Sequence, residues 1–501
     1  MLSTLIWLPI FGAVIIALLP KKIPANQIRF ASAFIAGITF LWNIFILFNF
    51  DIANPQFQLQ EYLSWNETLG LSYQLGADGL SILMLLLNSL LTWIAIYSSS
   101  KTTERPRLFY SLVLLVSGGV AGAFSAENLL LFFLFYELEL IPFYLLISIW
   151  GGKRRSYAGI KFLIYTAVSG ALILASFLGI VWLSGSSSFN YDVISTEGIS
   201  LTLQLILLTT IIVGFGIKIP LVPLHTWLPD AYVEASAPVA ILLGGVLAKL
   251  GTYGVLRFGM GLFPETWGLV APGLAIWGAV SAMYGAVTAI AQKDIKRMVA
   301  YSSIGHMGYI LLAAAANTSL ALVGAISQMV SHGIILAILF HLVGVVESKV
   351  GTRELDKLNG LMSPVRGLPF ISALLILGGM GSAGIPGMTG FIAEFIVFQG
   401  SFSIFPIPTL LCVIATGLTA VYFVILLNRT CFGKLDNDLA YYPKVFWHEK
   451  MPAVILAVLI IFLGVQPNWL VRWSEQTSAA MVVNVSTQQS VQTASLVMGN
   501  E

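Results

Sequence analysis

The chain has 501 residues, of which 57% are hydrophobic and only 10% are charged. A soluble domain carries roughly 25% charged residues, and a mean hydropathy of +0.89 is too apolar for a surface exposed to water. Composition therefore excludes a soluble enzyme and indicates an integral membrane protein with many spans. A net charge of +2 gives no support to nucleic acid as a partner.

The chain has two cysteines, Cys412 and Cys431, and no C-x-x-C motif. Iron–sulfur clusters, c-type haem and tetrahedral zinc need more sulfur or closer spacing. A disulfide between the two is open, but lone membrane cysteines more often behave as small hydrophobes. Nucleotide-binding glycine motifs are also absent from the sequence. We therefore expect no cofactor and no metal in this chain, with any redox chemistry in partner subunits.

Apolar runs long enough to cross about 30 Å of hydrocarbon recur along the whole chain. Two of them, 203–236 and 369–405, are too long for one straight helix and contain internal breakers. With these two, the sequence predicts an all-α polytopic membrane protein with fourteen transmembrane helices. The other runs lie near residues 2–20, 28–48, 79–98, 109–126, 128–149, 159–183, 237–259, 270–291, 298–316, 320–346, 406–429 and 452–471.

The basic residues divide unequally between the two faces of this fourteen-span arrangement. If both termini lie on one face, that face receives only Arg257 and Arg472, both at span ends. By the positive-inside rule, the opposite face is cytoplasmic or stromal, and both termini are lumenal or periplasmic. That basic face receives Lys21, Lys22, Arg29, Lys101, Arg105, Arg107, Lys153, Arg154, Arg155, Lys293, Lys296, Arg297, Lys349, Arg353, Lys357, Arg366, Arg429, Lys434, Lys444 and Lys450.

The two overlong runs are interrupted at comparable places, by Pro220 and Pro223 in the first and by Gly384 and Pro386 in the second. Proline removes a backbone donor and clashes with the preceding turn, so we expect helices 7 and 12 to be broken. Isolated proline kinks are the alternative. Paired breaks favour two inverted five-helix repeats with a transport site at mid-membrane. The predicted units are helices 1–3, the two repeats, and helix 14 with a polar C-terminal tail: 1–108, 109–259, 260–429 and 430–501.

Several titratable residues fall inside predicted spans, where a charge costs about 2.5–3.5 kcal/mol on insertion scales. Each therefore needs a partner, water or a function. Lys249 lies too far from either end of its span to reach water. His306 with His332 or His341 could instead be the axial ligands of a haem, although no second pair of histidines is present. The candidate proton relay consists of Glu137, Lys218, Lys249, His306, His332 and Glu394.

Further polar residues are candidates for accessory roles. Glu139 lies about 200° around a continuous helix from Glu137, so the two cannot face one pocket. Tyr253 lies one turn from Lys249 on the same helix face, and Gln328 lies one turn from His332 in the same way. His225 and Asp230 flank the first break, where they can simply cap the second half-helix. The accessory set is Glu139, Tyr253, Gln328, His225 and Asp230.

Motifs along nearly the whole chain resemble the antiporter-like membrane subunits of respiratory complex I and its photosynthetic relative. Glutamate at position 394, where sister subunits have lysine, favours the chain 4 type of the cyanobacterial or plastid NAD(P)H–quinone oxidoreductase. The motifs are Gly76-Ala-Asp78-Gly-Leu-Ser, Tyr136-Glu-Leu-Glu-Leu-Ile-Pro142, Lys218-Ile-Pro-Leu-Val-Pro-Leu-His-Thr-Trp-Leu-Pro-Asp230, Ala235-Ser-Ala-Pro238, Leu247-Ala-Lys249, Asp294-Ile-Lys-Arg-Met-Val-Ala-Tyr-Ser-Ser-Ile-Gly-His-Met-Gly308 and Gly384-Ile-Pro-Gly-Met-Thr-Gly-Phe-Ile-Ala-Glu394-Phe.

The resemblance implies a role for each relay residue. Glu137 would pair with Lys218, next to Lys249 as the central proton-carrying lysine. The two histidines would bridge from Lys249 to Glu394, the terminal relay on broken helix 12. The family also has fourteen spans with helices 7 and 12 broken.

The resemblance further implies a proton-translocating subunit whose energy comes from quinone reduction in partner subunits. Its partners would be other membrane-arm subunits, including sister antiporter-like subunits, and lipids, in a cyanobacterial or plastid thylakoid. The stretches Ala231-Tyr-Val and Gly244-Gly-Val-Leu-Ala-Lys-Leu-Gly-Thr-Tyr also resemble the variant found in carbon-dioxide-uptake forms. A stand-alone Na⁺ or K⁺/proton antiporter and a purely structural scaffold are the alternatives.

The charge asymmetry makes a testable topology prediction. A reporter fused after Arg155 should be cytoplasmic, and one fused after Glu501 should be lumenal, because the basic loops stay inside. Protease protection of the two fusions in sealed membranes would measure this. Finding both reporters on one face would contradict the fourteen-span arrangement.

Overall fold

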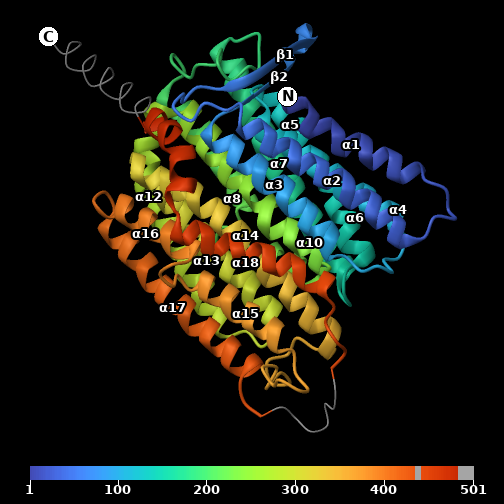
Figure 1. The fold of residues 1–501 in the computed structure, drawn as a ribbon. Coiled ribbons are helices and arrows are strands. Elements are labelled where there is room, and N and C mark those ends of the chain that lie inside the picture. The colour runs from blue at the N-terminus through green and yellow to red at the C-terminus, as the bar shows by residue number, and fades with distance from the viewer. Residues whose placement is uncertain (435–441, 483–501) are drawn as a thin grey trace.

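The computed structural model describes residues 1–434 and 442–482, a bundle of long helices with one small β-hairpin at one end (Figure 1). Within these residues, twelve helical segments are long and apolar enough to cross a membrane, and three shorter apolar helices accompany them. The protein is therefore a mostly helical polytopic membrane protein. The polar C-terminal tail predicted from the sequence lies outside the described residues from position 483 onward.

The elements follow one another along the chain with short connections. Residues 468–482 are also helical up to the point where the description ends. The named elements are α1 (Leu2–Leu18), α2 (Ala25–Leu47), β1 (Gln58–Asn66), a 3₁₀ turn (Glu67–Leu69), β2 (Leu71–Ala77), α3 (Gly79–Ser98), α4 (Pro106–Ser125), α5 (Leu129–Leu138), α6 (Leu140–Trp150), α7 (Arg155–Ser184), α8 (Leu201–Lys218), α9 (Trp227–Glu234), α10 (Ala237–Leu242), a π-helical turn (Leu243–Leu247), α11 (Ala248–Gly254), a second π-helical turn (Val255–Met260), α12 (Pro264–Ile290), α13 (Ile295–Ala316), α14 (Ser319–Val350), α15 (Pro369–Ser382), α16 (Thr389–Phe402), α17 (Pro406–Cys431) and α18 (Trp447–Val465).

Five segments form the centre of the bundle: α3, α4, α13, α14 and the helical stretch from α10 to the second π-helical turn. Each is at least 89% buried over its apolar window, whereas α2 is only 28% buried. Their starts are fixed locally, since the side chains of Asp78, Asp294 and Thr318 accept hydrogen bonds from the first turns of α3, α13 and α14. The central helices are surrounded by protein, so charged side chains on them are shielded from lipid as well as from water.

The β-hairpin was not predicted from the sequence, which indicated helices alone. Its two antiparallel strands lie outside the helical bundle. The Met1 ammonium pairs with Glu61 on β1, and the Gly79 amide donates to Thr477 Oγ1 at 2.9 Å. The N-terminus and the last described helix therefore both lie at the hairpin end of the bundle (Figure 1). Nearby, burial raises the pKa of the Glu127 carboxyl above its usual value.

Several helices are interrupted. α8 ends at Lys218 and α9 begins at Trp227, with Pro220 and Pro223 between them. Between α15 and α16, Gly384 and Gly387 adopt φ angles of +70° and +90°, a region that glycine enters without the steric cost of a side chain. The runs 128–149 and 237–259 were each predicted as one regular α-helix. In the structure the first has a turn at Glu139, and the second contains the two π-helical turns. The two cysteines are buried and unbonded to each other.

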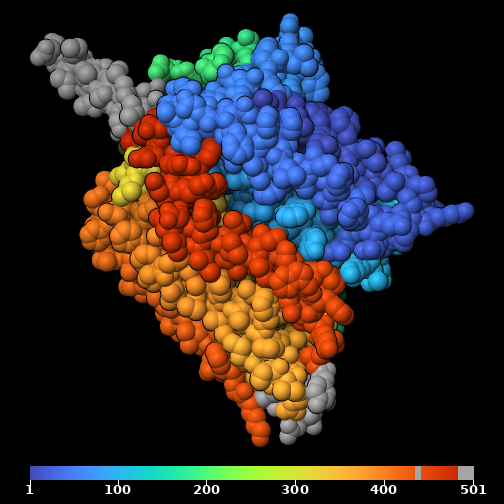
Figure 2. Space-filling view, viewed as in Figure 1, coloured from blue at the N-terminus to red at the C-terminus, as the bar shows by residue number. Residues whose placement is uncertain are grey.

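The C-terminal part of the chain covers a junction between distant segments. In Figure 2, α18 and the residues after it (red) lie between the N-terminal helices (blue) and the later helices (orange). α18 packs on α3, α14 and α16. It therefore joins the N-terminal three-helix layer to the central helix α14.

Candidate functional site

Lys249 lies in α11, between two π-helical turns. Its side chain is fully buried at 0% exposure. The ammonium donates to the Gly244 carbonyl at 2.6 Å and lies 2.9 Å from His332 Nδ1 on α14. No carboxylate is paired with Lys249 among the ion pairs of the described residues. π-helical turns are rare and are frequent at functional sites, so the local backbone also singles out this lysine.

A second contact extends from His332 towards α16. The rings of His332 and His306 stack with centroids 5.2 Å apart and planes at 21°. His306 Nε2 then lies 3.3 Å from Glu394 Oε1 and 3.2 Å from the Ser382 carbonyl. The stacked imidazoles leave no space for a haem between His306 and His332, so that pairing is wrong; His341, the other candidate ligand, has its Nε2 2.8 Å from the Glu449 carbonyl. Glu394 is 2% exposed, and Thr416 donates to its Oε2 at 3.2 Å.

Lys249, His332, His306 and Glu394 are thus joined by successive contacts across four different elements. Each of these side chains can bind and release a proton. Two steps of this series lack a hydrogen bond. The two imidazoles stack rather than donate to one another, and Glu394 Oε1, 3.3 Å from His306 Nε2, has no hydrogen-bond partner in the described residues. His332 Nε2 has no hydrogen-bond partner among residues 1–434 and 442–482. A water molecule or a ring rotation at that nitrogen would complete the step between the imidazoles.

The ion pair of Lys218 differs from the predicted one. Its Nζ donates to Glu139 Oε1 at 2.5 Å, with exposures of 1% and 0%, and lies 4.1 Å from the ring centroid of Tyr136. Glu137 is half-buried, with its carboxylate against Gly170 of α7. The predicted pairing of Glu137 with Lys218 is wrong in this structure. The two glutamates point to different neighbours, as their spacing on one helix predicts, and the one that faces Lys218 is Glu139.

The two residues beside the first break have other partners. The Asp230 carboxylate pairs with Lys161 at 2.8 Å and with Arg297 at 3.4 Å. It does not cap α9, whose start has no side-chain cap. His225 packs edge-on against Tyr284, with ring centroids 4.8 Å apart. Neither residue contacts the series that runs from Lys249 to Glu394.

A buried ion pair near the hairpin end escaped the sequence analysis. Arg257 Nη2 lies 2.6 Å from Asp78 Oδ2, and Arg257 Nε lies 3.4 Å from Tyr253 Oη. From its position at a span end, Arg257 reads as an ordinary loop cation. Its spacing of eight residues from Lys249, on the same helix face as Tyr253, was the available signal. Gln328 is 1% exposed, and its Oε1 has no partner in the described part of the chain.

The transmembrane family model described as "NADH:quinone oxidoreductase/Mrp antiporter, TM" matches residues 126–419. The chain belongs to this family. More particularly, it is 38% identical over 496 residues to NAD(P)H-quinone oxidoreductase chain 4 of Acaryochloris marina, covering 97% of this chain and 92% of that protein. It is 40% identical over 480 residues to the chain 4 of Prochlorococcus marinus (strain NATL2A), covering 93% and 89%.

Solved structures give the same result for the fold. A chain of respiratory complex I from Thermus thermophilus superposes with a TM-score of 0.87 at 26% identity, covering 97% of this chain and all of that one. A chain of the Mrp complex from Dietzia sp. also has a TM-score of 0.87, at 20% identity, with 97% and 98% covered. At that identity the second likeness shows the fold alone.

The pairing of Lys218 can be tested with two neighbouring glutamates. Glu139→Gln leaves the buried ammonium without its counter-charge, which costs about 3–5 kcal/mol. Glu137→Gln is the matched control, because Glu137 is half-buried and makes no ion pair with Lys218 in the structure. We expect the thermal stability of the purified complex and its proton pumping to fall much further in Glu139→Gln. A larger loss in Glu137→Gln would instead support the pairing expected from sequence.

Proposed function

We propose that this chain is a proton-translocating membrane-arm subunit of a NAD(P)H–quinone oxidoreductase. The observation that carries the proposal is the contact series Lys249–His332–His306–Glu394, which joins four titratable side chains through the buried centre of the bundle. The two named relatives are chains of NAD(P)H-quinone oxidoreductases, and the alignments cover nearly their whole length. Quinone reduction, with its cofactors, takes place in partner subunits.

A stand-alone cation/proton antiporter is not favoured. Identity to the chain 4 proteins is 38–40%, whereas identity to the Mrp chain is 20%. Native purification separates the two functions directly. A multisubunit quinone reductase, with sister antiporter-like subunits, should co-purify with this chain. Recovery with small antiporter subunits alone would contradict the proposal.

The proposed mechanism uses the two lysines in different ways. Lys218 with Glu139 forms a closed, electrically neutral pair. Opening that pair would leave a positive charge on α8, which packs against α11, and a nearby positive charge favours release of the proton from Lys249. His332 would receive the proton and pass it through His306 to Glu394. Reclosing the pair would allow Lys249 to reload from the basic face.

The membrane arrangement belongs to the same proposal. The three shorter apolar helices raise the span count from twelve to fourteen if α1 counts as one span and α15 with α16 as a broken one. α8 with α9 would be the other broken span, and two inverted repeats would cover 109–259 and 260–429. The hairpin end would be lumenal, with the basic loops cytoplasmic. Chain 4 relatives from cyanobacteria support a thylakoid location.

Lys249 provides the first test of proton transfer. Lys249→Met removes the titrating group, and it also removes a buried charge, so the complex should assemble. We expect proton pumping during quinone reduction to fall at least about tenfold, in line with the loss of a general acid–base group. Lys249→Arg should rescue little, since arginine stays protonated. Acidification of membrane vesicles measures the effect, and full pumping by the Arg variant would refute a protonation cycle here.

Glu394 provides a second, independent test. Glutamine has a similar size and hydrogen-bonding capacity but does not titrate. Glu394→Gln should therefore leave the abundance of the complex unchanged and lower the proton gradient several-fold. Glu394→Asp keeps a carboxyl group and should retain part of the activity. Unchanged pumping in the Gln variant would leave Glu394 with a structural role only, as an acceptor for Thr416.

A further inference from the structure

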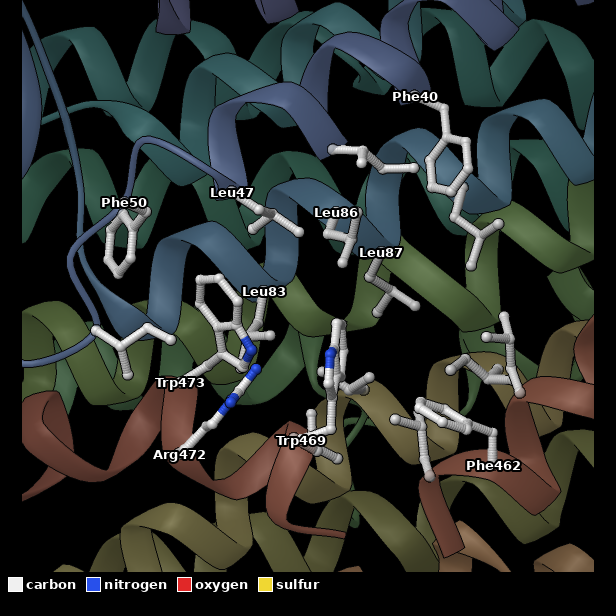
Figure 3. Close-up of a pocket in the computed structure, with 18 of the residues that line it drawn as sticks. Phe40, Leu47, Phe50, Leu83, Leu86, Leu87, Phe462, Trp469, Arg472 and Trp473 are labelled. Carbon is white, nitrogen blue, oxygen red and sulfur yellow. The ribbon is translucent and has the colours of Figure 1, made fainter. Parts of the chain in front are cut away.

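A cavity of about 590 Å³ lies between α2, α3, α14, α18 and the helical residues 468–482, away from the proton-transfer series (Figure 3). Eighteen of its nineteen lining residues are apolar or aromatic. A cavity of this size and composition matches typical small-molecule sites, which are mostly apolar with a few polar groups. The one exception is Arg472, the only charged side chain that lines it.

The lining changes in polarity along the length of the cavity. Arg472 and Trp473 come after the end of α18, and the Trp473 ring centroid lies 5.9 Å from that of Phe50, which follows α2 (Figure 3). From there, Leu83 and Leu90 extend the wall along α3 by about 10 Å, at 1.5 Å per residue. Tryptophan is the side chain that favours the membrane–water interface. One end of the cavity is therefore cationic and interfacial, and the rest extends into the apolar part of the bilayer.

The charge on Arg472 has no counter-charge within the described chain. No ion pair of residues 1–434 and 442–482 includes it. Its guanidinium points along the Trp473 ring towards the cavity (Figure 3). Arginine binds phosphate and carboxylate oxygens through two parallel hydrogen bonds, so this end of the cavity is complementary to an anion.

We propose that this cavity binds one anionic membrane lipid, with its headgroup on Arg472 and an acyl chain along α2 and α3. Arg472 is exposed at this end of the cavity, and a neutral quinone would make no use of its charge. A partner's transmembrane helix would need an acidic group at the level of Arg472. Basic pockets between transmembrane helices bind anionic headgroups by the same chemistry.

The position of the cavity connects the lipid to the central helix. Val330 and Ile334 line it from α14, on either side of His332 in the sequence. An acyl chain in the cavity packs against the helix that carries this histidine. The site is nonetheless independent of the proposed relay, because no relay residue lines it.

The charge-removal test uses the intact complex, purified in mild detergent and supplied with equal phosphatidylglycerol and phosphatidylcholine. Native mass spectrometry counts the lipids that stay bound. Arg472→Gln should lower retention of phosphatidylglycerol at least about tenfold, the effect of one charge-assisted hydrogen bond. Lys22→Gln, a charge removed from an exposed loop outside the cavity, is the control and should change nothing. Equal retention by wild type and Arg472→Gln would overturn the proposal.

A second variant tests occupancy of the apolar part. Leu86→Trp projects an indole into the cavity and should abolish retention of the lipid whatever its headgroup. Val458→Trp, at a neighbouring position on α18 that is 59% exposed and outside the cavity, is the matched control. A photo-crosslinking side chain at position 86 should label lipid. Labelling of a partner subunit in place of lipid would overturn the proposal.

Discussion

The burial of Lys249 without a carboxylate partner is the constraint on which the rest of the site depends. A buried ammonium normally needs a counter-charge, because removing it from water costs several kcal/mol. Here only the Gly244 carbonyl and one nitrogen of His332 contact it. No carboxylate holds this lysine in its charged form, as one does in a structural ion pair. The buried helices around it exclude both water and lipid.

Lys218 shows the contrast. Its pair with Glu139 neutralises both charges, and the ring of Tyr136 covers the ammonium. The two lysines are therefore not equivalent: Lys218 is held by a carboxylate, whereas Lys249 contacts a backbone carbonyl and an imidazole, and the imidazole can exchange a proton with it. A pump needs both kinds of site, one that changes the local field and one that responds to that field by loading or releasing a proton.

Much of this could be predicted from sequence, for identifiable physical reasons. Bilayer thickness sets helix length, so apolar runs located the long helices, and the cost of buried charge identified Lys249 and Glu394. The partner of Lys218 could not be predicted, because helical spacing separates Glu137 from Glu139 but does not say which of the two faces Lys218. The Arg257–Asp78 pair joins residues 179 positions apart, a separation that no local periodicity reports. The β-hairpin was missed because it lies outside the helical bundle, and a search for apolar runs of membrane-spanning length does not detect strands there.

In the proposed mechanism the two lysine sites are coupled without a continuous line of hydrogen bonds, since none connects Lys218 to Lys249 within the described residues. They are instead held close by tight helix packing. A Cβ at Gly251, two residues after Lys249, would lie within 3 Å of Ile219, the residue after Lys218. Only glycine permits that approach. In such an apolar contact the field of an unpaired Lys218 is weakly screened, so the coupling is electrostatic, and its strength depends on the separation of α8 and α11.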